Sequence, residues 1–160
     1  DADRHGGVAW PVRSGARMSA AAGTEPPVRF AGYAALFDKV DRGGDVIRKG
    51  AFAGALRRLA QAGTRVPLLW QHQPDARIGV IEQIAEDARG LRVIGRIEAG
   101  AGAETPAAQI RARKVAGLSF GYRVRAANGE RPRELTELDL VEVSLVTHPM
   151  QPGARVHAVE

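Results

Sequence analysis

Two residues in this sequence have the types that acyl transfer requires, a nucleophile and a base with a pKa near neutrality. Ser119 lies in the segment Gly-Leu-Ser-Phe-Gly, in which the flanking glycines allow another chain to approach the hydroxyl closely. His72 follows the apolar run Leu-Leu-Trp and precedes a proline-containing turn, where a strand presents a side chain at its end. A serine hydroxyl that gives its proton to an imidazole is a common nucleophile in hydrolases. The pair predicts acyl-transfer chemistry.

A third group must hold the imidazole in one tautomer, and a carboxylate suits this role. Glu142 lies in an otherwise apolar strand pattern, on the face opposite to Val141 and Val143. A carboxylate in such a strand needs a partner, because an unpaired buried charge costs several kcal/mol. His148, further along the chain, is the alternative orienting residue. The predicted catalytic residues are therefore His72, Ser119 and Glu142, with His148 as the alternative to Glu142.

The segment around Ser119 also has the form Gly-x-Ser-x-Gly, which is the nucleophile elbow of α/β-hydrolases. Asp139 followed by His148 or His157 would supply the other residues in the order of that fold. The elbow requires a strand, a turn and then a helix, whereas here a predicted helix precedes the serine and a strand follows it. The roughly 40 residues after the serine are also too few for the remaining βα units. The sequence disfavours this alternative.

Composition limits the classes of protein that fit. The chain has 160 residues, of which 44% are apolar, which suits one domain with one core. The absence of cysteine excludes disulfides, thiolate zinc sites and a cysteine nucleophile, and no His-Glu-x-x-His spacing occurs, so we expect no metal and no cofactor. No run approaches the roughly 18 apolar residues of a membrane helix, so we expect no membrane partner. The net charge of +5 comes from scattered arginines, and we expect no specific nucleic-acid partner.

The patterns predict one β-rich domain over residues 28–160, preceded by a flexible tail over residues 1–27 that is rich in Ala, Gly, Arg and Pro. A helix is expected from Phe52 to a C-cap at Gly63, and a second from Thr105 to Val115. Strands are expected over residues 28–37, 66–71, 77–84, 91–98, 120–126 and 135–146, the last two forming a hairpin. Several strands with two helices and no regular βαβ alternation predict an α+β fold, a small antiparallel β-barrel decorated by helices.

Several blocks of sequence occur in a specific order and spacing. They are Gly32-Tyr33-Ala34 through Phe37, Asp41 to Ile47, Gly50-Ala51-Phe52, Leu68 to His72, Gly117 to Tyr122, and Leu140 to Thr147 with Pro149. Through these blocks the chain resembles, from Phe30 to Pro152, the prohead protease family of tailed phages and of phage-like gene transfer particles.

This resemblance implies a fold similar to herpesvirus assemblin, a β-barrel surrounded by helices. It implies that Ser119 is the nucleophile and His72 the base. For the third catalytic residue the resemblance gives a less direct assignment, because assemblin-like enzymes have a second histidine where their phage relatives have an acid. Glu142 lies in the strand that carries this acid. The implied task is capsid maturation in the bacterial cytoplasm, inside the assembling prohead. There the enzyme would cleave scaffold segments, the N-terminal region of the major capsid protein and itself, and would associate with further copies.

A hypothesis from another class is a non-catalytic basic barrel that serves as an assembly factor or binds nucleic acid. In that case Ser119 and His72 would have no chemical role. A reagent that labels active-site serines distinguishes the two hypotheses, because only an enzyme would react at Ser119. A steep dependence of DNA affinity on salt would favour the binding module.

Overall fold

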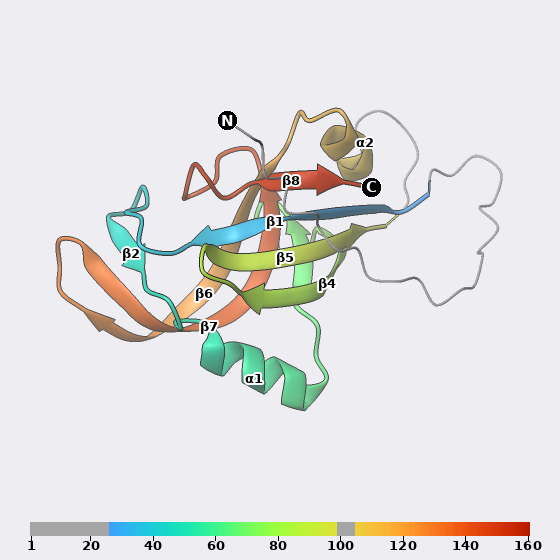
Figure 1. Cartoon of the computed structure of the whole chain (residues 1–160). Helices are drawn as coiled ribbons and strands as arrows, with labels where there is room; N and C mark the ends of the chain where they lie inside the picture. The colour runs from blue at the N-terminus through green and yellow to red at the C-terminus, as the bar shows by residue number, and fades with distance from the viewer. Residues whose placement is uncertain (1–25, 99–104) are drawn as a thin grey trace.

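The computed structural model describes residues 26–98 and 105–160, and this part of the chain forms eight strands and two helices (Figure 1). The expected tail, residues 1–27, lies outside the described residues except for its last two prolines. The first strand begins at Val28, where the sequence predicts the start of the folded domain. The strands are β1 Val28–Leu36, β2 Asp45–Ile47, β3 Pro67–Trp70, β4 Arg77–Glu86, β5 Gly90–Ile97, β6 Gly117–Asn128, β7 Arg133–Val146 and β8 Val156–Val159, and the helices are α1 Ala53–Ala62 and α2 Pro106–Arg111.

All eight described strands belong to one sheet. Their order is β2-β7-β3-β4-β5-β1-β8, and β6 pairs with β7. The sheet curls into a half-barrel, so that β1 also packs against β6, while α1 and α2 lie at opposite ends of the molecule in Figure 1. The architecture confirms the predicted α+β class and the barrel decorated by helices.

The pairing at β7 adds parallel strands that the sequence does not predict. Strands β2 and β3 both run parallel to β7, whereas its partner β6 is antiparallel. Because β6 occupies one edge of β7 from residue 134 to residue 146, β2 and β3 share the other edge. The chain leaves β2, passes through α1, which packs on β7, and rejoins the same edge as β3. The segment before His72 is thus fixed to the strand that carries Glu142.

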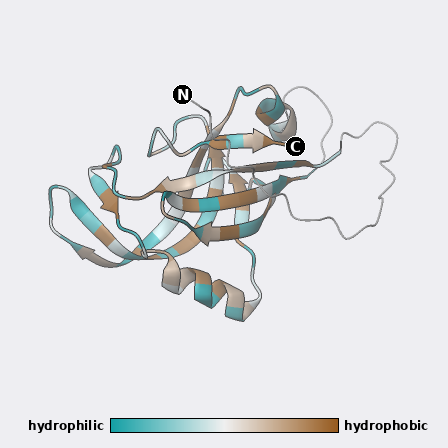
Figure 2. Cartoon of the chain, in the orientation of Figure 1, coloured by the Kyte–Doolittle hydropathy of each residue, from teal (hydrophilic) through white to brown (hydrophobic). Residues whose placement is uncertain are grey.

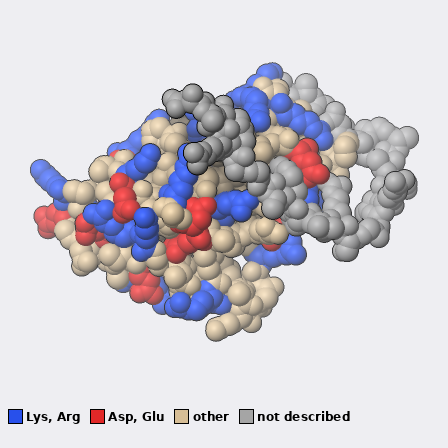
Figure 3. Space-filling view, in the orientation of Figure 1, with Lys and Arg blue, Asp and Glu red and all other residues tan. Residues whose placement is uncertain are grey.

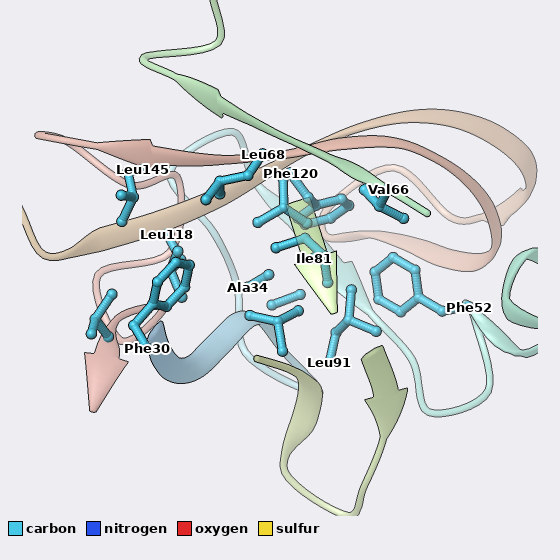
Figure 4. Close-up of a cluster of buried hydrophobic side chains, with 14 of the residues drawn as sticks. Phe30, Ala34, Phe52, Val66, Leu68, Ile81, Leu91, Leu118, Phe120 and Leu145 are labelled. Atoms are coloured by element: carbon cyan, nitrogen blue, oxygen red, sulfur yellow. The ribbon is translucent and has the colours of Figure 1, made fainter. Parts of the chain in front are cut away.

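Apolar side chains from distant parts of the chain fill the inside of the sheet. Phe30, Leu68, Leu118 and Leu145 are fully buried and point toward one another, together with Phe52 at the start of α1 (Figure 4). Each such side chain contributes roughly 1.5–3 kcal/mol through burial. Along β5, the half-buried Arg92 and Arg96 are interspersed among buried residues, as in a strand with one more accessible face, and Figure 2 shows polar and apolar residues mixed along the strands. One core therefore fixes β1, β3, β6 and β7 relative to one another.

The helices begin and end largely where their sequence signals lie. Gly63 ends α1 in the left-handed conformation, with φ 64, and the Thr105 side chain caps α2 by accepting a backbone N–H. The α2 helix ends at Arg111, earlier than the predicted Val115. The reason is a left-handed residue, Arg113 with φ 58, after which Val115 turns into the core. Neither described helix has the length and apolar character of a membrane span.

Candidate active site

The pairing of β6 with β7 places four small or polar residues on one face of these two strands. Ser119 lies directly opposite Ser144, and Gly121 lies directly opposite Glu142. Opposed residues on paired strands share a face, as do residues two positions apart on one strand. The predicted nucleophile and the predicted acid are therefore on the same face of neighbouring strands.

His72 lies in the turn that follows β3. Strand β7 lies between β3, which leads to His72, and β6, which carries Ser119. Gln71 and His72 both adopt the left-handed conformation, with φ 52 and φ 59. This conformation costs a non-glycine residue about 1–2 kcal/mol, so surrounding contacts must hold the turn.

Hydrogen bonds to β7 and the residue after it hold this turn. The backbone N–H of Gln71 donates to the Leu145 carbonyl at 2.9 Å, and that of His72 donates to Ser144 Oγ at 3.2 Å. The Gln71 side chain donates from Nε2 to Thr147 Oγ1 at 2.7 Å and accepts the Thr147 N–H at 3.0 Å. These four contacts fix the position of His72 over β7.

The imidazole of His72 contacts the carboxylate of Glu142, with Nδ1 2.5 Å from Oε1. The second oxygen, Oε2, accepts a hydrogen bond from Ser144 Oγ at 2.6 Å. Glu142 is only 8% exposed, so both oxygens have the partners that a buried carboxylate needs. A Cβ at Gly121 would lie 2.6 Å from Oε1, so the absence of a side chain there makes room for the acid.

The hydrogen bond to Glu142 raises the pKa of His72 above its ordinary value. Partial burial of the ring acts in the opposite direction but is the weaker effect. Because the carboxylate accepts at Nδ1, the neutral ring carries its proton there and has a free lone pair on Nε2. An imidazole oriented in this way is suited to accept a proton.

His72 and Ser119 line the same small cavity, which has a volume of about 90 Å³. Ser119 is 6% exposed, and within the described residues its hydroxyl makes no hydrogen bond. A free hydroxyl in the same cavity as an oriented imidazole supplies the two groups that a serine nucleophile needs. A larger hollow of about 430 Å³, between α1 and strands β4 and β5, contains none of the predicted catalytic residues. The other residues of the small cavity are Ala34, Asp41, Leu118, Phe120, Tyr122, Met150 and Gln151.

The remaining candidates from the sequence lie elsewhere. His148 is exposed after β7, and among the described contacts the acid partner of His72 is Glu142. Asp139 is held in ion pairs with two arginines, and the His157 ring packs edge-on against a tyrosine. The sheet is mixed rather than doubly wound and parallel, so the structure contradicts the α/β-hydrolase alternative. Over residues 26–98 and 105–160, no group of three metal-ligating side chains comes together.

Three residues of this network are missing from the sequence-based candidates. Ser144 links Glu142 to the His72 backbone, Gly121 makes room for the acid, and Gln71 holds the turn. The period-two pattern that places Ser144 on the face of Glu142 was the available signal. Gly121 belongs to the glycine-flanked segment of Ser119, but its role beside the acid, like the role of Gln71, depends on the pairing of distant strands and has no local signal.

Replacing Ser144 with alanine should lower the free energy of unfolding by about 1–3 kcal/mol, because the buried partners of its hydroxyl lose a hydrogen bond. Ser144 is fully buried between the His72 N–H and Glu142 Oε2. Guanidinium denaturation measures the change. The matched control is Ser119→Ala, directly across the strand pair, which should change stability by less than about 0.5 kcal/mol. Equal losses in the two variants would contradict the linking role of Ser144.

The model of a protein family, caudovirus prohead serine protease, matches residues 16–160 of this chain. The match begins within the segment that the sequence predicts to be a tail. The chain is also 35% identical over 97 residues to the prohead protease of Enterobacteria phage HK97. That alignment covers 59% of this chain and 42% of the phage protein, so the chain spans less than half the length of this curated relative.

Two solved structures share the fold. The capsid assembly protease gp21 of bacteriophage T4 has a TM-score of 0.58 and 16% identity, over 74% of this chain and 81% of that protein. The protease of KSHV, in complex with a hexapeptide phosphonate inhibitor, has a TM-score of 0.53 and 11% identity, over 84% of this chain and 65% of that protein. At such identities the likeness concerns the fold, and it confirms the assemblin-like architecture. Because the family model covers most of its length, the chain belongs to the caudovirus prohead serine protease family.

Proposed function

We propose that this chain is a serine endopeptidase in which Ser119 is the nucleophile, His72 the general base and Glu142 the residue that orients the base. One observation carries the proposal: the His72 imidazole is held by Glu142 at 2.5 Å in the wall of the cavity that also contains Ser119. Membership of a serine protease family supports the same chemistry.

In the proposed reaction, His72 Nε2 takes the proton of Ser119 as the hydroxyl oxygen attacks a peptide carbonyl carbon. The tetrahedral intermediate collapses, and His72 returns this proton to the leaving amine, which departs as the new N-terminus. Water then gives a proton to His72 and attacks the acyl ester, which releases the carboxylic product and restores the Ser119 hydroxyl. Glu142 stays ionised throughout and stabilises the imidazolium that forms in each half of the reaction.

The oxyanion that forms in both steps needs backbone donors. The sequence alone does not assign these donors, and the candidate sources are the segments 117–120 and 147–150, which contribute residues to the cavity wall. The Leu118 amide already donates to Ala154 at 2.9 Å, and the Thr147 amide donates to Gln71 Oε1 at 3.0 Å. Pro149 has no N–H. We propose the amide of Met150 as one donor, because this residue lines the cavity together with Ser119.

The proposed biological role is capsid maturation inside the assembling prohead, in the bacterial cytoplasm. Support comes from the family and from two relatives that are named as a prohead protease and a capsid assembly protease. The proposed substrates are scaffold segments, the N-terminal region of the major capsid protein and the enzyme itself. Association with further copies inside the shell would raise the local concentration and with it the rate of self-cleavage.

Charged side chains give the nucleic-acid-binding alternative no specific support. On the face shown in Figure 3, basic and acidic side chains alternate over the described residues. Several of the arginines are paired: Arg58 and Arg125 with Asp139, and Arg133 with Asp45. Paired arginines are less available for phosphate contacts than free ones.

A fluorophosphonate reagent should label Ser119, because among the serines of residues 26–98 and 105–160 only Ser119 lines the cavity of the oriented imidazole. Mass spectrometry of the digested protein locates the adduct. Ser144, fully buried and hydrogen-bonded, is the internal control and should stay unmodified. Labelling should disappear after denaturation. An unreactive native protein would contradict the proposed enzyme and favour a binding module.

A further inference from the structure

The cavity that contains Ser119 and His72 also contains one carboxylate that the proposed mechanism does not use. Asp41, on the loop between β1 and β2, lines its wall. Asp41 Oδ1 accepts hydrogen bonds from the backbone N–H groups of Gly43 at 2.8 Å and Asp45 at 3.0 Å. These bonds fix the orientation of the carboxylate at the cavity wall and leave Oδ2 for another partner.

The charge of Asp41 is not neutralised by a basic side chain of the described residues, among which it forms no ion pair. The charge of Asp41 acts on Arg133, but this guanidinium makes two hydrogen bonds to Asp45, at 3.0 and 2.9 Å. The three side chains therefore carry one net negative charge. Burial, followed by the charges of Asp45 and Asp41, raises the pKa of Tyr122 in the same wall, which is the effect that a negative potential has.

The remaining walls of the cavity are apolar or already hydrogen-bonded. Phe120 and Met150 contribute apolar surface. The Gln151 side chain accepts the Leu36 N–H at 2.7 Å and donates to the Leu36 carbonyl at 2.8 Å, so both ends of its amide are used. Asp41 is thus the fixed anionic group of an otherwise largely apolar cavity. Such a cavity suits a side chain with an aliphatic stem and a cationic end.

We propose that Asp41 selects substrates in which a basic residue, lysine or arginine, supplies the carbonyl that Ser119 attacks. This inference rests on the proposed function of Ser119 and His72. The cavity of about 90 Å³ has room for one side chain, so a group that contacts Asp41 must belong to a residue at the scissile bond. In this proposal Asp41 determines which substrates bind productively, whereas Ser119 and His72 carry out the reaction.

The test uses the rate at which Ser119 is labelled by two matched peptidyl phosphonate diphenyl esters. One carries a 4-aminobutyl side chain next to phosphorus, as in lysine, and the other carries a butyl side chain. The wild type should react about tenfold faster with the amine, which corresponds to the lower end of measured couplings between close charges. The ratio cancels any change in the reactivity of Ser119 or His72, since both reagents share the reacting group.

The Asp41→Asn variant should lose this preference and give a ratio near one. The amide oxygen of asparagine still accepts the N–H groups of Gly43 and Asp45, so the loop keeps its bonds while the charge is removed. Asp38→Asn is the matched control, because this acid lies on the same loop but outside the cavity and pairs with Arg48 rather than with Arg133, and it should keep the wild-type ratio. In the wild type alone, added salt should reduce the preference, which tests the charge even if a variant does not fold.

The outcomes separate the two proposals. Equal rates for both reagents in the wild type, or an unchanged ratio in Asp41→Asn, would overturn the role of Asp41 while leaving the serine peptidase in place. Labelling by a small fluorophosphonate but by neither peptidyl reagent would also overturn it, since the cavity would then not admit the side chain. A wild type that reacts with no phosphorus reagent would contradict the proposed function itself.

Discussion

The Ser119→Ala variant should fold as the wild type does and leave the proposed substrate, the cognate major capsid protein, uncleaved. We expect the rate of cleavage to fall by about 10⁴-fold or more, because no other group in the cavity takes the place of the attacking oxygen. Co-expression with the cognate major capsid protein, followed by gel electrophoresis and mass spectrometry of the products, measures the loss. The same samples report self-cleavage.

The structure indicates that this substitution should leave the stability of the fold almost unchanged. Within the described residues the Ser119 hydroxyl makes no hydrogen bond, so alanine leaves no buried partner unsatisfied. A melting temperature within about two degrees of the wild type would show that the fold is intact. Normal cleavage by a folded Ser119→Ala protein would contradict the assignment of the nucleophile.

Much of the fold follows from local patterns. Period-two alternation predicts β1 and β5, strand-like runs on either side of a turn predict β3, β4 and the β6–β7 hairpin, and the helical spacing with Gly63 predicts α1. Strands β2 and β8 are short and have no pattern long enough to recognise. Their formation depends on edges that β7 and β1 provide, and this information is not local. The parallel pairing of β3 with β7 is equally absent from the sequence pattern.

The residue types of the candidate site could be predicted, but not the way they are held together. Apolar neighbours indicated that Glu142 needs a partner, and the structure supplies His72 and Ser144. The left-handed turn at Gln71 and His72 could not be predicted, because both residues disfavour it and contacts to β7 stabilise it. The sequence thus identifies side chains that can act in catalysis, but the register of the paired strands determines which of them are in contact.

The strand register also determines which groups donate and which accept in the hydrogen bonds between His72, Glu142 and Ser144. Ser144 Oγ accepts the His72 N–H, so its own proton goes to Glu142 Oε2. The carboxylate is therefore an acceptor on both sides, from Ser144 and from His72 Nδ1. A side chain at position 142 that donates in place of one of these bonds would reverse the tautomer of the imidazole.

Replacing Glu142 with glutamine should produce this reversal. The Ser144 hydroxyl needs an acceptor, so the glutamine oxygen should turn toward Ser144 and its NH₂ group toward His72 Nδ1. The imidazole would then carry its proton on Nε2 and could not accept one from Ser119. We expect kcat to fall by about 10³- to 10⁴-fold, as for the wrong tautomer in other serine peptidases. The nitrogen chemical shifts of the His72 ring report the tautomer directly and independently of activity.

The pH dependence of the residual activity should move in a defined direction. A general base works in its neutral form, so activity rises as the pH passes the pKa of His72. In the wild type this pKa is raised, chiefly by the hydrogen bond to Glu142. Glutamine removes that bond and the negative charge, whereas the partial burial that lowers the pKa remains. The rise in activity of Glu142→Gln should therefore occur at lower pH than in the wild type, although its plateau is far lower. A rise at the same pH, or at higher pH, would mean that Glu142 does not set the protonation of His72.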